Sequence, residues 1–112
     1  MKELSVIVTV MNEEDNIQPL VKATQDALQG IDYELIFVDD GSTDETRPRI
    51  KQLASDRIVL IELKRNYGQS TAMAAGIDNA RGEYVALMDG DLQNDPSDIP
   101  MMLISLKGKT GT

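Results

Sequence analysis

Four short apolar runs rich in β-branched residues constrain the fold of this 112-residue chain more strongly than any other feature of its sequence. They cover residues 4–10, 33–38, 58–63 and 84–88. Each run has the length of a strand rather than of a helix, and its nearly continuous apolar character is typical of a strand buried on both faces of a sheet. The sequence therefore predicts four interior strands.

Stretches with helical periodicity separate these runs. In the first stretch, apolar residues recur at spacings of three and four between residues 17 and 28. We place the start of this helix at Asn16, because Pro19 then lies in the first turn, where its missing N–H costs nothing. Gly30 is predicted to end the helix as its C′ residue.

Capping signals and small residues predict the other three helices. The second opens with Ser42 and Glu45, which can satisfy each other's backbone donors as a capping box, although Pro48 then lies deep enough to distort the first turn. The third covers residues 70–80 and is rich in Ala and Gly, so it can lie very close to a sheet. The last is predicted to start after Ser97 and to continue to the end of the chain.

The alternation of strands and helices predicts one α/β domain over residues 1–112. The connections are long enough for right-handed crossovers, so the sheet is expected to be mainly parallel, with helices on both faces. Hydrophobic residues make up 41 % and charged residues 27 % of the chain, as in proteins with a packed core. In such sheets a ligand binds beyond the carboxyl ends of the strands, where the strand order reverses.

The residue types that the sequence lacks limit its chemistry. With no Cys and no His, these 112 residues have no thiolate or imidazole, so catalysis would rest on carboxylates, hydroxyls or a hard metal ion. The net charge of −8 argues against a nucleic-acid partner or an anionic membrane surface. No apolar run approaches the roughly 18 residues of a membrane span, and no signal peptide is recognisable, so the chain is expected to be cytoplasmic.

An acidic turn after the fourth apolar run is the candidate metal site. Asp89 and Asp91 stand one residue apart where the chain leaves the strand, and Gln93 adds a neutral oxygen. Mg²⁺ and Mn²⁺ prefer such hard oxygen ligands. The alternative interpretation is an acidic turn in which Gly90 adopts a special backbone angle. We expect the metal site, because polar clusters also follow the other three runs.

Carboxylates also follow the first and second runs. Asp40 can accept hydrogen bonds from a base or from ribose hydroxyls, and Asp39 can do the same or serve the turn that Asp-Gly-Ser-Thr favours. We predict that Asp40 recognises a nucleoside and that Asp39 serves mainly the turn. Glu13 can hold ribose hydroxyls from the neighbouring strand end, or can simply favour a helix N-terminus.

Basic and glycine-rich residues follow the third run. Lys64 and Arg65 stand where a diphosphate can lie, although basic residues at strand ends are more often only solvated. Gly68-Gln69-Ser70 opens a helix whose free N–H groups can face a phosphate. No G-x-G-x-x-G follows the first run, so a dinucleotide-binding fold has no support.

Four motifs at these strand ends together resemble family 2 glycosyltransferases, which have the GT-A fold. They are V-I-V-T-V-M-N-E-E at residues 6–14, F-V-D-D-G-S-T-D at 37–44, R-N-Y-G at 65–68 and M-D-G-D-L-Q at 88–93. The run from Asp89 through Gln93 to Pro96 is most similar to the polyprenyl-phosphate branch, which includes dolichol-phosphate mannosyltransferase and undecaprenyl-phosphate sugar transferases. The resemblance implies an enzyme of cell-wall or glycolipid biosynthesis that uses a nucleotide-diphosphate sugar.

The resemblance also implies roles for individual residues. Asp89 and Asp91 would hold Mg²⁺ or Mn²⁺ and the donor diphosphate, with Gln93 beside the metal and Asp91 as the catalytic residue. The UDP- or GDP-linked donor would lie against Thr9, Met11, Glu13, Val38, Asp39, Asp40, Gly68 and Gln69. Met11 and Thr9 stand where the family usually has Tyr and Pro, so stacking of the base against residue 11 is expected to be weak.

In this family, the acceptor site and the general base lie in a second half of the enzyme. Residues 1–112 are therefore expected to be a truncated GT-A half-domain that binds the donor without transferring its sugar. The parent enzyme would invert the anomeric carbon, use a lipid-phosphate or saccharide acceptor, and be membrane-associated. An uncovered sheet edge or apolar face is expected to make the half-domain self-associate.

Two alternative functions stay open. One is a non-catalytic module that binds a nucleotide or a partner chain. The other is a receiver-type signalling domain, which has similar length, acidity and topology and also uses an acidic pair with Mg²⁺. Its acidic pair should follow the first strand, whereas the acidic pairs here follow the second and fourth.

Overall fold

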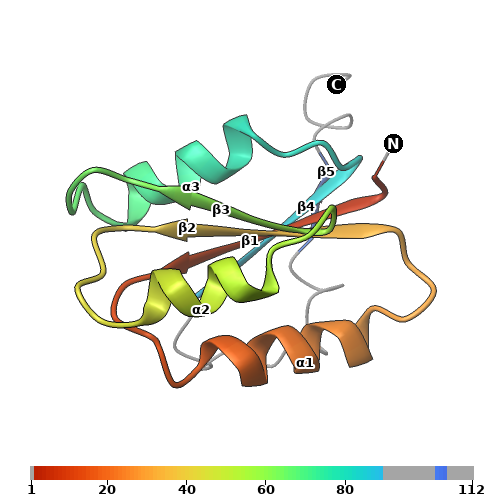
Figure 1. The fold of residues 1–112 in the computed structure, drawn as a ribbon. Helices are drawn as coiled ribbons and strands as arrows, with labels where there is room; N and C mark the ends of the chain where they lie inside the picture. Colours follow the sequence, from red (N-terminus) through yellow and green to blue (C-terminus); the bar gives the residue numbers. More distant parts are fainter. Residues whose placement is uncertain (1, 90–102, 106–112) are drawn as a thin grey trace.

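The computed structural model describes residues 2–89 and 103–105, which form one sheet with helices on both of its faces (Figure 1). The strands are β1 (Leu4–Val10), β2 (Tyr33–Asp39), β3 (Ile58–Glu62), β4 (Tyr84–Asp89) and β5 (Leu103–Ser105). Their order is β3-β2-β1-β4-β5, with β1 to β4 parallel and β5 antiparallel to β4. The predicted mainly parallel α/β sheet is confirmed, and each of the four predicted strands ends within one residue of the expected position.

The last predicted helix is wrong where the structure describes it. Residues 97–102 lie outside the described residues, but Leu103–Ser105 form strand β5, which pairs with residues 84–86 of β4. The physical reason is that β4 has backbone N–H and C=O groups on this side, and a neighbouring strand satisfies them. Local periodicity cannot reveal an available sheet edge, because the edge exists only in the tertiary structure.

The helices of the described residues follow the first three strands. They are α1 (Ile17–Ala27), α2 (Thr46–Leu53) and α3 (Gln69–Asp78). The predicted start of α1 after Asn16 is confirmed. Gly30 adopts the left-handed backbone, with a φ of 83°, but it lies two residues beyond the C-cap Leu28 rather than directly after it. None of the helices within the described residues has both the length and the apolar surface that a bilayer crossing requires.

The predicted capping box at the start of α2 is wrong. Glu45 rather than Ser42 occupies the N-cap position, and its side chain makes no capping hydrogen bond. The Ser42 hydroxyl instead accepts a hydrogen bond from the backbone N–H of Asn12, at 2.8 Å. Because α2 begins at Thr46, Pro48 falls within the first turn, where a missing N–H needs no distortion.

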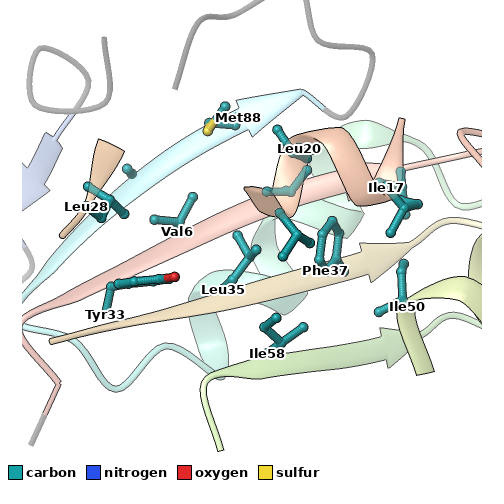
Figure 2. Packing of buried hydrophobic residues seen from close by; sticks show 14 of the residues in the cluster. Val6, Ile17, Leu20, Leu28, Tyr33, Leu35, Phe37, Ile50, Ile58 and Met88 are labelled. Atoms are coloured by element: carbon teal, nitrogen blue, oxygen red, sulfur yellow. The ribbon is translucent and has the colours of Figure 1, made fainter. Parts of the chain in front are cut away.

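Two hydrophobic layers cover the two faces of the sheet, because successive strand residues point to opposite sides. The larger layer lies between the sheet and helices α1 and α2, and Figure 2 shows Leu35 and Phe37 of β2 among its buried residues. The smaller layer lies on the opposite face, where Ile7, Ile36 and Val38 pack with Ala72 of α3. Replacing the fully buried Phe37 by Ala would destabilise the fold by about 3–5 kcal/mol.

Helix α3 lies directly on the sheet, as its small residues predict. A Cβ atom at Gly76 would collide with the side chain of Ile7 in β1 and would lie 3.2 Å from a methyl group of Val38 in β2. The helix can approach this closely only because Gly76 has no side chain. Helix α3 begins directly after Gly68, at the carboxyl edge of the sheet.

Candidate functional site

The carboxyl ends of four parallel strands meet at one edge of the sheet. In the register, Val10 of β1 lies opposite Asp39 of β2, and Asp39 lies opposite Glu62 of β3. On the other side of β1, Thr9 lies opposite Asp89, the last residue of β4. The strand order reverses between β1 and β4, which is where open α/β sheets bind their ligands. The structure therefore brings the described residues of these polar clusters to one edge, as the sequence predicts, whereas residues 90–93 lie outside the described residues.

Asp39 is fully buried and organises the turn after β2. Its Oδ1 atom accepts hydrogen bonds from the backbone N–H groups of Gly41 and Ser42, at 2.9 and 2.8 Å. The same oxygen accepts a third hydrogen bond from Nε of Arg47, at 2.8 Å. These contacts agree with the predicted turn role of Asp39. The other oxygen, Oδ2, is buried without a hydrogen-bond partner among the described residues, so Asp39 retains an unused acceptor.

Arg47 of α2 ties this turn to strand β3 and was not singled out by the sequence. Beyond its bond to Asp39, its guanidinium donates to the backbone carbonyl of Leu63, at 2.7 Å, and lies 3.5 Å from the Glu62 carboxylate. One side chain thus joins α2, β2 and the end of β3. Nothing in the local sequence distinguishes Arg47 from a solvated helix residue, because two of its partners, Glu62 and Leu63, lie at the end of the next strand.

Asp40 holds the loop that precedes α3. It is 7 % exposed, and its Oδ1 and Oδ2 atoms accept the backbone N–H groups of Tyr67 and Gly68, at 2.8 and 3.0 Å. The next residue, Gly41, has a φ of 101°, and a Cβ atom there would lie 3.0 Å from the backbone nitrogen of Asn66. Both oxygens of Asp40 are therefore engaged by backbone. Its predicted nucleoside contact stays a prediction and would use the remaining lone pairs.

The loop after β1 is fastened to the loop after β2. The Asn12 side-chain oxygen accepts the N–H of Thr43, at 2.8 Å, and the N–H of Glu13 donates to the Thr46 hydroxyl, at 2.8 Å. The Asp44 carboxylate accepts hydrogen bonds from the Thr46 hydroxyl and N–H and from the N–H of Glu14. Burial raises the pKa of Asp44, but these hydrogen bonds together hold the pKa below its ordinary value.

Two partly exposed apolar side chains lie at the same edge. Met11 is 39 % exposed and Tyr67 is 48 % exposed. The Asn66 side-chain amide lies 3.6 Å from the Met11 sulfur, and the Arg65 guanidinium lies 5.5 Å from the centre of the Tyr67 ring. The loop at residues 65–68 is thus next to Met11. No role was predicted for Tyr67 beyond its place in the R-N-Y-G motif. Its exposed ring adds an aromatic surface to the site.

Several predicted site residues receive little or no description. Asp91 and Gln93 lie outside the described residues. Asp89 and Gln69 are described only by their backbone, at the end of β4 and the start of α3. No cluster of three or more acidic residues that could hold a metal ion occurs within residues 2–89 and 103–105. The metal site therefore stays a prediction.

A second polar cluster lies at the opposite, amino-terminal edge of the sheet. Glu34 of β2 is buried, and its carboxylate accepts hydrogen bonds from the Ser5 hydroxyl, at 2.6 Å, and from the backbone N–H of Arg81, at 2.7 Å. The Arg81 guanidinium adds a hydrogen bond and an ion pair at 3.0 and 2.9 Å. Burial raises the pKa of Glu34, but these partners together hold the pKa below its ordinary value.

The cluster at the amino-terminal edge borders a hollow of about 490 Å³ whose lining includes Lys2, Asp56 and Arg81. Its cations are already paired, Lys2 with Asp32 and Arg81 with Glu34. This cluster was not predicted from the sequence, although Glu34, an acidic residue inside an apolar run, was a visible signal. Because the charges satisfy each other, the cluster is best explained as structural.

Comparisons with known proteins bear on the family of the chain as a whole. Residues 5–109 match the model of the family described as glycosyl transferase family 2. A dodecaprenyl-phosphate galacturonate synthase of Rhizobium johnstonii is 47 % identical over 110 residues, which cover 94 % of this chain and 32 % of that protein. The family match contradicts the receiver-type signalling alternative.

Solved structures agree with the fold. S. aureus TarS 1-349 in complex with UDP-GlcNAc superposes with a TM-score of 0.70 at 29 % identity, covering 80 % of this chain and 26 % of that chain. The mannosyltransferase PcManGT from Pyrobaculum calidifontis in complex with GDP-Man and Mn²⁺ has a TM-score of 0.74 over 87 % of this chain and 30 % of that chain. At 24 % identity, the second structure shows the GT-A fold alone. The chain spans about a third of the length of the curated relative above, and by its match over residues 5–109 it belongs to glycosyl transferase family 2.

Proposed function

We propose that this chain forms the donor-binding part of an enzyme that transfers a sugar from a nucleotide diphosphate to a polyprenyl phosphate or a saccharide, with inversion at the anomeric carbon. One observation carries the proposal. The family 2 match falls on a sheet whose strand order reverses at the edge where Asp39, Asp40 and Asp89 lie. The name of the Rhizobium johnstonii relative supports a polyprenyl-phosphate acceptor.

The nucleotide is proposed to bind along the ends of β1 and β2. Glu13 and Asp40 would contact the nucleoside, with Met11 beside the base. The unpaired buried oxygen of Asp39 supports this position, because a buried acceptor without a partner costs about 1–3 kcal/mol unless a ligand satisfies it. Met11 and Tyr67 offer exposed apolar surface to a base. The proposed set also includes Thr9, Val38, Gly68 and Gln69, and the donor would be UDP- or GDP-linked.

The donor diphosphate is proposed to bind with Mg²⁺ or Mn²⁺ held by Asp89, Asp91 and Gln93, and Asp91 is the proposed catalytic residue. The chemistry of this donor set fits a hard divalent ion. When bound, such an ion would act as a Lewis acid for the departing diphosphate. Asp89 ends β4 directly beside Thr9, which supports a position at the reversal of the strand order.

The remaining partners and the location belong to the longer enzyme and are proposals as well. A polyprenyl-phosphate acceptor lies in a bilayer, so the parent enzyme would be membrane-associated while this domain faces the cytoplasm. Self-association of the chain is proposed too, and light scattering at several protein concentrations tests it. The family match favours catalysis over the non-catalytic module that the sequence left open.

Calorimetric titration of the 112-residue chain with UDP and with GDP, each with and without MnCl₂, tests the proposal. We expect one nucleotide to bind more tightly with Mn²⁺, and Asp91→Ala to remove that gain. Asp56→Ala is a matched control, because it removes the same charge from an exposed position before β3 at the opposite edge. Failure of both nucleotides to bind the wild-type chain would overturn the proposed function, and an unchanged Mn²⁺ effect in Asp91→Ala would overturn the metal assignment.

A further inference from the structure

Asn12 has a backbone conformation that few residues adopt without strain. Its φ of 55° lies in the left-handed region, and it is the only residue other than Gly within the described residues with a positive φ. Asn tolerates this region better than other side chains, because its short polar group can hydrogen-bond locally. The conformation turns the chain sharply between the end of β1 and the start of α1, and it aims the Asn12 side chain at the loop after β2.

The Asn12 side chain and backbone together join the two loops. Its Oδ1 atom accepts the Thr43 N–H at 2.8 Å, the Thr43 hydroxyl at 3.4 Å and the Asp44 N–H at 3.3 Å. Its own N–H donates to the Ser42 hydroxyl, at 2.8 Å. We call these contacts, with the bond from Glu13 N–H to the Thr46 hydroxyl, the loop clasp. Oδ1 is the acceptor in all three of its hydrogen bonds, so the clasp needs an acceptor atom at this position.

The loop clasp lies between the two groups of residues proposed to bind the nucleotide. Met11 and Glu13 flank Asn12 on the first loop, and Asp39 and Asp40 lead directly into the second. A site built from two separate loops loses conformational entropy when a ligand fixes them, and this loss weakens binding. A clasp that is already formed in the free protein removes part of that loss before the ligand arrives.

We propose that Asn12 is a positioning residue that presets the distance between the two halves of the nucleotide site. This inference rests on the proposed function. Asn12 acts through Thr43 and Asp44 and does not itself contact the ligand. Two properties of Asn12, the acceptor oxygen and the tolerance of a left-handed backbone, are both required, and substitutions can separate them. Asn12→Asp keeps both properties, whereas Asn12→Gly keeps the backbone and loses the acceptor.

Calorimetric titration of the 112-residue chain with UDP and with GDP, well below the unfolding temperature, tests this role. We expect Asn12→Gly to raise the Kd about tenfold and Asn12→Asp to stay within about threefold of wild type. In the Gly variant, amide hydrogen exchange should become faster at Thr43 and Asp44. Ser5→Ala is a matched control, since it removes a hydrogen bond at the other end of β1 and should lower stability without changing the Kd.

The outcomes separate this proposal from the proposed function. Failure of the wild-type chain to bind either nucleotide refutes the proposed function and this inference with it. Normal binding by wild type with an unchanged Kd for Asn12→Gly refutes only the positioning role. An equal loss of affinity in Ser5→Ala also refutes it, because general destabilisation would then explain the effect.

Discussion

Strand β2 carries a buried carboxylate near each end, and the two differ in how completely they are satisfied. At the amino-terminal edge, both oxygens of Glu34 have partners, from Ser5 and Arg81. At the carboxyl edge, Asp39 shares one oxygen among three donors, and its other oxygen has none within the described residues. Buried polar atoms in folded proteins almost always have a hydrogen-bond partner, so of these two carboxylates Asp39 is the exception. The contrast is between a carboxylate whose hydrogen bonds are complete within the described residues and one that keeps an unused acceptor.

The largest expected effect is a loss of stability at the amino-terminal edge. Glu34→Ala should lower the free energy of unfolding by about 3 kcal/mol, because it removes several charge-assisted hydrogen bonds and leaves a void. Urea denaturation measures the change. Glu3→Ala, an exposed carboxylate nearby, is the control. Nucleotide affinity of the folded Glu34→Ala protein should stay unchanged, and a weakened affinity would contradict the structural role of this edge.

A smaller effect, on binding, is expected at the carboxyl edge. Asp39→Asn keeps an oxygen for the Gly41 and Ser42 N–H groups but places a donor where Oδ2 now offers an acceptor. We expect the Kd for the bound nucleotide to rise about tenfold, equivalent to about 1.4 kcal/mol, with a smaller loss of stability than in Glu34→Ala. Calorimetry measures the Kd, and urea denaturation measures the free energy of unfolding. If Asp40→Asn weakens binding and Asp39→Asn does not, the division predicted from the sequence, in which Asp40 rather than Asp39 recognises the nucleoside, is correct.

The smallest expected effect is the pH dependence of the Glu34 contribution. The folded-state pKa of Glu34 lies below its ordinary value, so the unfolded state takes up the proton first as the pH falls. The stabilisation by Glu34 is therefore fully present above the ordinary Glu pKa and disappears as the pH falls through the lower, folded-state pKa. The free energies of unfolding of wild type and Glu34→Gln, measured from pH 7 to pH 3, should become more similar as the pH falls. A difference in unfolding free energy that stays constant over this pH range would show that the pKa of Glu34 does not change on folding.

Most of the fold was predictable because its determinants are local. The β-branched runs gave all four parallel strands, and the position of Pro19 gave the start of α1. Strand β5 and the start of α2 were mispredicted for a shared reason. The edge of β4 and the N–H of Asn12 supply the deciding hydrogen bonds, and both are distant in sequence from the segments that they shape.

The candidate site was predictable in its location but less so in its internal contacts. The strand-end motifs predicted that the carboxylates lie at one edge, and the register confirms this for Asp39 and Asp89. The partners of those carboxylates were not visible. Asp40 bonds to Tyr67 and Gly68, and Glu34 bonds to Arg81, at separations of 27, 28 and 47 residues. The donors that satisfy buried carboxylates are set by the packing of distant elements, so no local sequence pattern predicts them.

The exposed positions beside the candidate site bear on how the proposed donor preference can change during evolution. Gly41 cannot accept a side chain, because its backbone is left-handed and lies against Asn66. Met11 and Tyr67 are partly exposed, and substitutions at exposed positions usually change stability by only about 0.5 kcal/mol. Selection can therefore alter the surface at residues 11 and 67, where the base is proposed to lie, while Gly41 and the turn that contains it stay fixed.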